Sequence, residues 1–159
     1  MVRYSQKHCK IILHNKELVF LTPTDTTVGF VSQSALRLTQ IKQRPPHKHF
    51  IKALPSLSVL QSFVRVPQKH KNRIRRAKRS TFVFPNGYSY RIIREKQHLS
   101  LIQKLGWAYT TSANLSGESF DELFAKDAAD IIIKYPSRQI YKSASSIFKL
   151  NKIKLLRVR

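Results

Sequence analysis

The chain has 159 residues, the length of one domain, and 42% of them are hydrophobic, which excludes a disordered chain and allows a buried core. It carries 30 lysine and arginine residues against 8 aspartate and glutamate residues, a formal net charge of +22. This charge favours a polyanionic partner such as nucleic acid, or a phosphate-rich ligand, although a generally basic proteome would also produce it.

The cysteine content and the apolar runs restrict the class of protein further. The single cysteine, Cys9, excludes an internal disulfide and a cysteine-rich zinc site, and an ordinary free thiol is favoured over a nucleophile there. The N-terminal residues are charged and lack the apolar run of a signal peptide, and no run reaches the roughly 18 apolar residues of a membrane span. We therefore expect a cytoplasmic protein with no membrane partner.

The first part of the chain is predicted to alternate between strand and helix. Residues Glu17–Thr22 form a short apolar run that stops at Pro23, which is typical of a buried strand. A helix is expected from Ser32 to the residue before Pro45, because apolar side chains recur at helical spacing and a residue before proline avoids the helical conformation. A second, weaker helix is expected over Leu54–Val64.

A β-hairpin is predicted in the middle of the chain. Asn86 and Gly87 lie between the runs TFVF and YSYRII, and an Asn-Gly pair between β-rich runs is a strong hairpin signal. The segment before it, Lys69–Arg79, is the most basic, with lysine or arginine at seven of its eleven positions. After the hairpin, a helix over Leu99–Leu105 is expected to end at Gly106.

Short elements separated by polar loops are predicted for the last third of the chain. They are a strand over 107–111, a polar loop over 112–117, a helix over 120–126, and strands over 131–133, 145–150 and 153–158. Interleaved strands and helices with a central hairpin favour an α/β or α+β fold, with one mixed sheet around one core. We expect a single domain over residues 1–159.

Three polar segments are candidates for binding or catalysis. Thr22–Gly29 follows a predicted strand, where open sheets bind ligands, but its threonines and aspartate could also serve only to stabilise a turn. Lys42 and Arg44 could both face one phosphate chain at a helix end. Thr110–Gly117 could contact phosphate or ribose, or could be a turn and helix-capping cluster.

Other familiar sites are missing from the sequence. Neither GxxxxGK[ST] nor GxGxxG occurs, so the polar loops are not a Walker A or a Rossmann motif. The six histidines form no HExxH motif, and we expect no protein-bound metal. No GxSxG nucleophile elbow is present.

Taken in order, these segments resemble the YrdC-like family of threonylcarbamoyl-AMP synthases. TPTDTTVGF resembles the family's PTDTVYGL signature, Lys42-Gln43-Arg44-Pro45 its KxRP motif, and TTSANLSG its TSANxSG motif. Tyr90-Arg91-Ile92 lies where the family has an arginine in a short strand; Ser145-Ser146-Ile147 resembles its STI element, and Leu155-Leu156-Arg157 its final arginine. The likeness runs from about residue 16 to 157, and these short motifs in the right order are a specific signal.

The resemblance implies a fold and a reaction. The fold would be a twisted mixed sheet with flanking helices around a concave, positively charged cavity. The reaction would convert ATP, L-threonine and bicarbonate to threonylcarbamoyl-AMP and pyrophosphate, with magnesium shielding the ATP phosphates. A partner transferase would then use the adenylate to modify the adenosine 3′ of the anticodon in ANN-decoding tRNAs.

The resemblance also assigns residues. Lys42 and Arg44 would act catalytically by neutralising the triphosphate and the leaving pyrophosphate. ATP would be bound by five residues: Lys42, Arg44, Ser112, Asn114 and Arg157. Threonine would be bound by four: Thr26, Arg91, Thr110 and Ser145, with Arg91 forked onto its carboxylate. Val28 replaces the signature tyrosine and is expected to remove an aromatic wall from the threonine pocket.

A second hypothesis comes from the charge alone: a non-catalytic protein on the same fold that binds tRNA or ribosomal RNA. The candidate contacts lie in the basic segment: Arg73, Arg75, Arg76, Lys78 and Arg79. Such a run would contact phosphates without reading sequence, and the binding should fall steeply with salt. The run could equally be a solvated helix or loop. The spaced set of Lys42, Arg44, Ser112 and Asn114 favours the synthase, because RNA binding alone does not need it.

Overall fold

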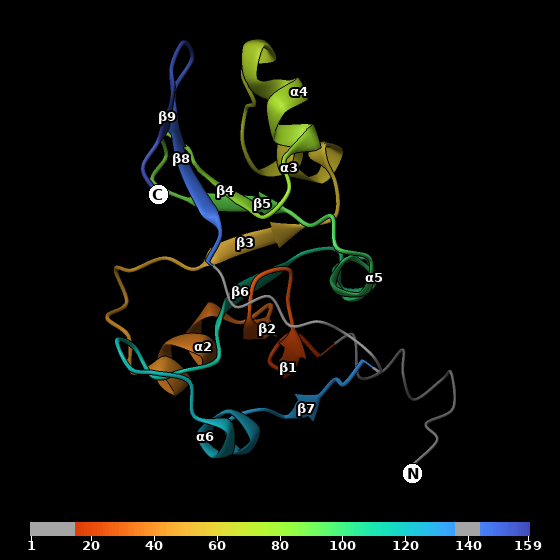
Figure 1. The fold of residues 1–159 in the computed structure, drawn as a ribbon, viewed down its shortest axis with the longest axis vertical. Coiled ribbons are helices and arrows are strands. Elements are labelled where there is room, and N and C mark those ends of the chain that lie inside the picture. Colours follow the sequence, from red (N-terminus) through yellow and green to blue (C-terminus); the bar gives the residue numbers. More distant parts are fainter. Residues whose placement is uncertain (1–14, 136–143) are drawn as a thin grey trace.

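One mixed sheet of nine strands organises the part of the chain that the computed structural model describes, residues 15–135 and 144–159 (Figure 1). Its strand order is β7-β1-β2-β6-β3-β5-β4-β8-β9. The strands are β1 Val19–Pro23, β2 Val28–Ser32, β3 Ile51–Leu54, β4 Ser80–Val83, β5 Ser89–Ile92, β6 Ala108–Ser112, β7 Ile131–Ile132, β8 Ser146–Leu150 and β9 Leu155–Arg157. The helices are α2 Ala35–Lys42, α3 Leu57–Phe63, α4 Gln68–Arg76, α5 Lys96–Leu105 and α6 Glu122–Asp127.

The sheet mixes both kinds of pairing. The pairs β1–β7, β3–β5 and β4–β8 are parallel, and the other neighbours are antiparallel. The sheet twists from the β7 end to the β8–β9 end, with α3 and α4 beside β8–β9 and α2 and α6 at the opposite end (Figure 1). The predicted fold class, one mixed twisted sheet with flanking helices, is confirmed.

The core is built by strands that send alternate side chains to opposite faces. In β1, Phe20 joins the cluster around Ile102 of α5, whereas Leu21 joins the cluster around Leu38 of α2. A third cluster, which includes Ile74 of α4 and Phe82 of β4, lies under α3 and α4. Each cluster contains side chains that are almost completely buried, so helices cover both faces of the sheet.

Most predicted elements are confirmed, and the hairpin is the clearest case. In the β4–β5 pair, Phe82 is opposite Tyr90, and the turn closes with a hydrogen bond from the Phe84 amide to the Tyr88 carbonyl at 3.0 Å. Gly87 has a φ of 81°, a conformation that glycine adopts without a steric cost. The helix predicted to end at Gly106 does so.

Two strands were not predicted. The sequence predicts a loop up to Gly29 and a helix from Ser32; instead β2 occupies Val28–Ser32 and α2 begins at Ala35. Position 29 lies inside β2, and it requires glycine because a Cβ there would lie 2.6 Å from the Thr111 carbonyl oxygen of β6. The weak helix predicted from Leu54 begins at Leu57, and β3 precedes it.

No helix within the described ranges combines the length and the hydrophobicity that a bilayer crossing would need.

Candidate functional site

A cavity of about 540 Å³ brings together most of the polar segments singled out in the sequence. Its lining is dominated by hydroxyl groups: Thr24, Thr26, Thr27, Thr81, Ser89, Thr110, Thr111, Ser112 and Ser145. Its cationic and imidazole side chains are Arg44, His49, Arg91 and Arg159. The lining residues described here include no carboxylate, so the cavity suits an anionic ligand with hydrogen-bonding groups.

Arg91 lies at the centre of the buried part of this site. Its Nε and Nη2 both donate to the Thr81 hydroxyl at 3.0 Å, and Nη2 also donates to the Ser145 hydroxyl at 2.8 Å. Its Nη1 donates to Asp25 Oδ1 at 2.9 Å and reaches the Thr26 hydroxyl at 3.5 Å. All five guanidinium hydrogens therefore have an acceptor within the protein.

Asp25 is the buried counter-ion of Arg91. The side chains of the pair are 5% and 3% exposed, so neither charge is solvated by bulk water. The Asp25 amide donates to His98 Nδ1 at 3.3 Å, so Nδ1 is the acceptor of this hydrogen bond. Asp25 Oδ2 is buried and has no hydrogen-bond partner among the described residues. The carboxylate thus depends on Arg91 for its charge compensation.

The loop before β2 combines the two roles that the sequence left open. The Thr24 hydroxyl donates to the Thr27 carbonyl at 2.6 Å and accepts from the Thr26 and Thr27 amides, so the segment is a turn capped by its own side chain. The same turn presents Thr24, Thr26 and Thr27 to the cavity.

Lys42 is placed differently from the prediction. Its side chain is buried, and it lies outside the described cavity lining. Its ammonium group donates to the Ser112 carbonyl at 2.8 Å, to the Asn114 carbonyl, and to Asn114 Oδ1 at 3.2 Å. Burial, and secondarily the charge of Arg44, lower the pKa of Lys42 to about 8. Lys42 therefore holds the loop that follows β6, rather than facing the cavity directly.

Arg44 does line the cavity, as predicted. Its Nη2 donates to the His49 carbonyl at 3.4 Å, its guanidinium lies 5.0 Å from the Phe50 ring centroid, and burial lowers its pKa. Its Nε is buried without a hydrogen-bond partner among the described residues. Unlike Arg91, Arg44 has donors that a ligand could occupy.

Ser112 and Thr110 line the cavity from β6, whereas the Asn114 side chain makes its hydrogen bonds to Lys42 and to its own loop. Asn114 Nδ2 donates to the Leu115 carbonyl at 2.8 Å and to the Glu118 carbonyl, while its Oδ1 accepts from Lys42. Both ends of the amide therefore fix the loop, and the structure does not bring Asn114 into the cavity lining.

Arg157 is not part of the cavity lining, and Arg159 is. Arg157 is opposite Phe148 in the β8–β9 pair, so it shares the face of the sheet on which Phe148 lies, away from the cavity. Its Nη2 reaches the Ser146 hydroxyl at 3.4 Å. The Val158 and Arg159 amides both donate to the Ile147 carbonyl, a bulge that turns Arg159 toward the cavity.

His49 and Ser89 also line the cavity and were not singled out in the sequence. Strand alternation could have indicated Ser89, because it lies two residues before Arg91 and shares its face.

The protein family is settled by comparison with known proteins. A family model, Sua5–YciO–YrdC, described as telomere recombination, matches residues 12–158. The chain belongs to the Sua5–YciO–YrdC family. This confirms the resemblance read from the motifs.

One curated relative of this Sua5–YciO–YrdC chain is much longer than the chain itself. The uncharacterized protein MG259 homolog of Mycoplasma pneumoniae is 32% identical over 109 residues, 68% of this chain but 23% of that protein. The chain thus spans about a quarter of the length of that curated relative.

Two solved structures of the Sua5–YciO–YrdC family share the fold. The P. abyssi Sua5 structure complexed with L-threonine has a TM-score of 0.79 at 18% identity, covering 99% of this chain and 55% of that one. E. coli YciO has a TM-score of 0.70 at 18% identity, covering 99% and 90%.

Val28 replaces the family tyrosine, and the loss of an aromatic wall from the threonine pocket stays a prediction. Val28 packs with the cluster that includes Leu38 and Phe30, and it lines a different hollow beside Tyr135. It is not among the residues that line the 540 Å³ cavity.

The predicted RNA contacts lie away from the cavity in this family member. Arg73, Arg75 and Arg76 are exposed on α4, Lys78 is exposed just beyond it, and Arg79 is half-buried at the start of β4. None of the five is in the cavity lining.

Replacing Lys42 by methionine is expected to change how stability depends on pH. The pKa of Lys42 falls from 10.5 to about 8 on folding, so between these values the unfolded chain binds a proton that the folded chain has released. The Lys42 contribution to the unfolding free energy therefore rises with pH across this window. Urea unfolding at several pH values between about 7 and 10 should show this rise in the parent chain and not in Lys42→Met. Parallel profiles would contradict the assignment, and Lys104→Met on the exposed side of α5 is the control.

Proposed function

We propose that this chain is an L-threonylcarbamoyladenylate synthase. The observation that carries the proposal is the 540 Å³ cavity, in which hydroxyl groups surround Arg91 at one side and Arg44 and Arg159 supply further cations. Membership of the Sua5–YciO–YrdC family supports it, as does the P. abyssi relative solved with L-threonine.

Threonine would bind beside Arg91. Because every guanidinium hydrogen of Arg91 already has an acceptor, a threonine carboxylate can take the fork only by displacing a hydroxyl such as Ser145 or Thr26. A displaced hydroxyl can then donate to the same carboxylate. Thr110, on the same lining, would contact the amino acid. Asp25 and Thr81 would keep the guanidinium fixed during this exchange.

The ATP phosphates would lie against Arg44, Arg159 and Ser112. Arg44 has donors available, and its guanidinium fork matches phosphate oxygens. Lys42 would act one step away, by fixing the Ser112–Asn114 loop against which the nucleotide binds. Arg159, which lines the cavity, would take the role that the family resemblance gave to Arg157.

Magnesium fits this site only as a companion of the nucleotide. The described residues contain no cluster of three histidine, cysteine or acidic side chains, and the cavity lining offers hydroxyls and cations. Mg²⁺ prefers oxygen ligands and is commonly held by substrate phosphates, where it would neutralise part of their charge.

The reaction can proceed without a covalent enzyme intermediate. Condensation of the threonine amine with bicarbonate gives N-carboxythreonine and water, with a proton released from the ammonium form. A carbamate oxygen then attacks the α-phosphorus, and the bond to the β-phosphate oxygen breaks with its electron pair leaving on pyrophosphate. The cations of Arg44 and Arg159 would stabilise the charge that develops on the leaving group.

The second candidate, a non-catalytic RNA-binding protein on this fold, is favoured by the exposed arginines of α4. It differs from the synthase in predicting no threonine-dependent turnover.

Pyrophosphate release from ATP tests the proposal, with and without L-threonine and bicarbonate. We expect release only when all three substrates are present. Nucleotide binding without threonine-dependent release would contradict the synthase and favour the non-catalytic protein.

A further inference from the structure

Two grooves separate α4 from the β8–β9 hairpin, on the face of the sheet opposite the cavity. In β4, Thr81 and Val83 line the cavity, whereas Phe82 between them lines the first groove. In β8, Ile147 lines the cavity and Phe148 lines the same groove. The α4 helix and the β8–β9 hairpin stand side by side at one end of the molecule (Figure 1).

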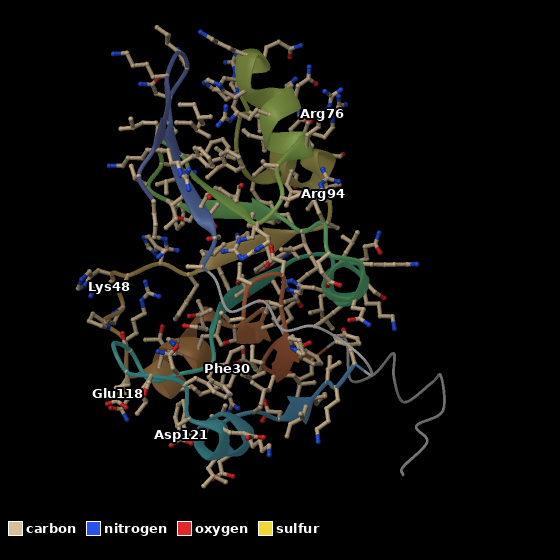
Figure 2. All side chains as sticks on the ribbon, in the orientation of Figure 1. Phe30, Lys48, Arg76, Arg94, Glu118 and Asp121 are labelled. Carbon is tan, nitrogen blue, oxygen red and sulfur yellow. The ribbon has the colours of Figure 1, made fainter. Side chains whose placement is uncertain are left out.

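The two grooves combine cationic walls with an apolar floor. The first, of about 390 Å³, has Arg73 and Arg76 on its wall, with the Arg73 guanidinium 5.1 Å from the Phe148 ring centroid. The second, of about 780 Å³, is lined by Arg65, Lys71 and Lys152 among other residues. We call the surface formed by both grooves the α4–β8 face; side chains including Arg76 extend from α4 at this end of the molecule (Figure 2).

No carboxylate neutralises these cations. The sequence has no aspartate or glutamate between Thr26 and Arg94, or after Asp130. The ion pairs of lysine and arginine found in the described ranges involve Arg37, Arg91 and Lys126, and none involves a cation of the α4–β8 face. The acidic side chains labelled Glu118 and Asp121 lie at the opposite end of the molecule (Figure 2).

The stability of the α4 helix does not account for its many lysine and arginine residues. Cations in the last turn of α4, such as Arg73 and Arg76, do suit the helix dipole. Lys69 and Lys71, however, lie in the first turn, where the dipole disfavours positive charge. The helix begins after Pro67 with no side-chain cap and no acidic residue in that turn. The charges of Lys69 and Lys71 therefore weaken the isolated helix, which favours a role toward a partner.

We propose that the α4–β8 face binds the phosphate backbone of RNA. Cations on both walls would contact phosphates, while the floor around Phe148 would accept the apolar faces of bases or riboses. The choice of RNA over DNA rests on the proposed function, whose product serves tRNA modification. Because the face lies across the sheet from the cavity, RNA and ATP would bind at the same time.

The decisive variant pair is Arg76→Gln with Lys152→Gln, one residue from each wall. Both side chains are exposed, and neither is placed in the proposed synthase site. Lys96→Gln with Lys104→Gln on α5 removes the same charge elsewhere and is the matched control. Binding of an unmodified tRNA transcript is measured as a function of KCl concentration.

Several results are expected from this titration. The α4–β8 variant should bind tRNA about tenfold more weakly, and the slope of log K against log salt should fall by about two, near one per lost phosphate contact. The α5 control should change neither value appreciably. Saturating ATP should leave tRNA binding unchanged, and the α4–β8 variant should keep the parent's pyrophosphate release.

Other results would overturn the proposal. Equal losses in both variants would mean that only net charge matters, and displacement of tRNA by ATP would place RNA in the cavity. Tighter binding of duplex DNA of similar length would exclude RNA as the preferred partner, and tighter binding of poly-L-glutamate would indicate an acidic protein. Since pyrophosphate release is scored separately, failure of the RNA proposal remains distinguishable from failure of the synthase.

Discussion

The Arg44→Ala variant is expected to lose about 10²- to 10³-fold in threonine-dependent pyrophosphate release. Arg44 is the predicted catalytic cation that lines the cavity, and its Nε has no acceptor among the described residues. Its charge would be most valuable when pyrophosphate leaves, because negative charge then accumulates on the β-phosphate. The loss should therefore appear in kcat as well as in kcat/KM for ATP.

Two comparisons make the Arg44 prediction specific. Lys48→Ala removes an exposed cation from the same loop, outside the cavity lining, and should leave release within a factor of about two. Lys42→Ala should lower both release and stability, because it frees the Ser112 and Asn114 carbonyls from their shared ammonium donor. Release from Arg44→Ala at the parent's rate would remove Arg44 from the site.

The sequence predicted those elements whose ends are marked by short local patterns, such as turn residues and a glycine at a helix end. The Asn86-Gly87 turn and the Gly106 helix end are set by backbone conformations that glycine adopts easily, and both are confirmed. β2 and β3 carry no such signal: they are five and four residues long, and Gly29 lies within β2 for a reason that lies in β6. Only the tertiary contact between Gly29 and Thr111 explains that residue.

In the candidate site, too, the sequence predicted some placements of side chains and not others. Motif order was sufficient to bring Thr26, Arg91 and Ser145 to one cavity, although they are far apart in the chain. It could not separate Arg157 from Arg159, because a bulge opposite Ile147 decides which of them turns inward. Motif order also could not show that the Lys42 ammonium group donates its hydrogen bonds to the loop after β6. Those bonds join residues that are 70 or more positions apart in the chain.

The Arg91→Leu variant is expected to lose about 3–5 kcal/mol of unfolding free energy, the usual result of removing one partner of a buried ion pair. Asp25 would keep its charge in a site where Oδ2 already has no hydrogen-bond partner among the described residues. The Thr81 and Ser145 hydroxyls would lose their guanidinium donors as well. Urea unfolding followed by circular dichroism gives the free energy directly.

A double-mutant cycle with Asp25→Asn separates the ion pair from simple packing. If the loss in Arg91→Leu comes from the stranded carboxylate, Asp25→Asn should recover part of it in the double variant, although the same change destabilises the parent. Additive losses would mean that Asp25 is not compensated by Arg91. In that case Asp25 would not hold the guanidinium in place during the exchange proposed for threonine binding.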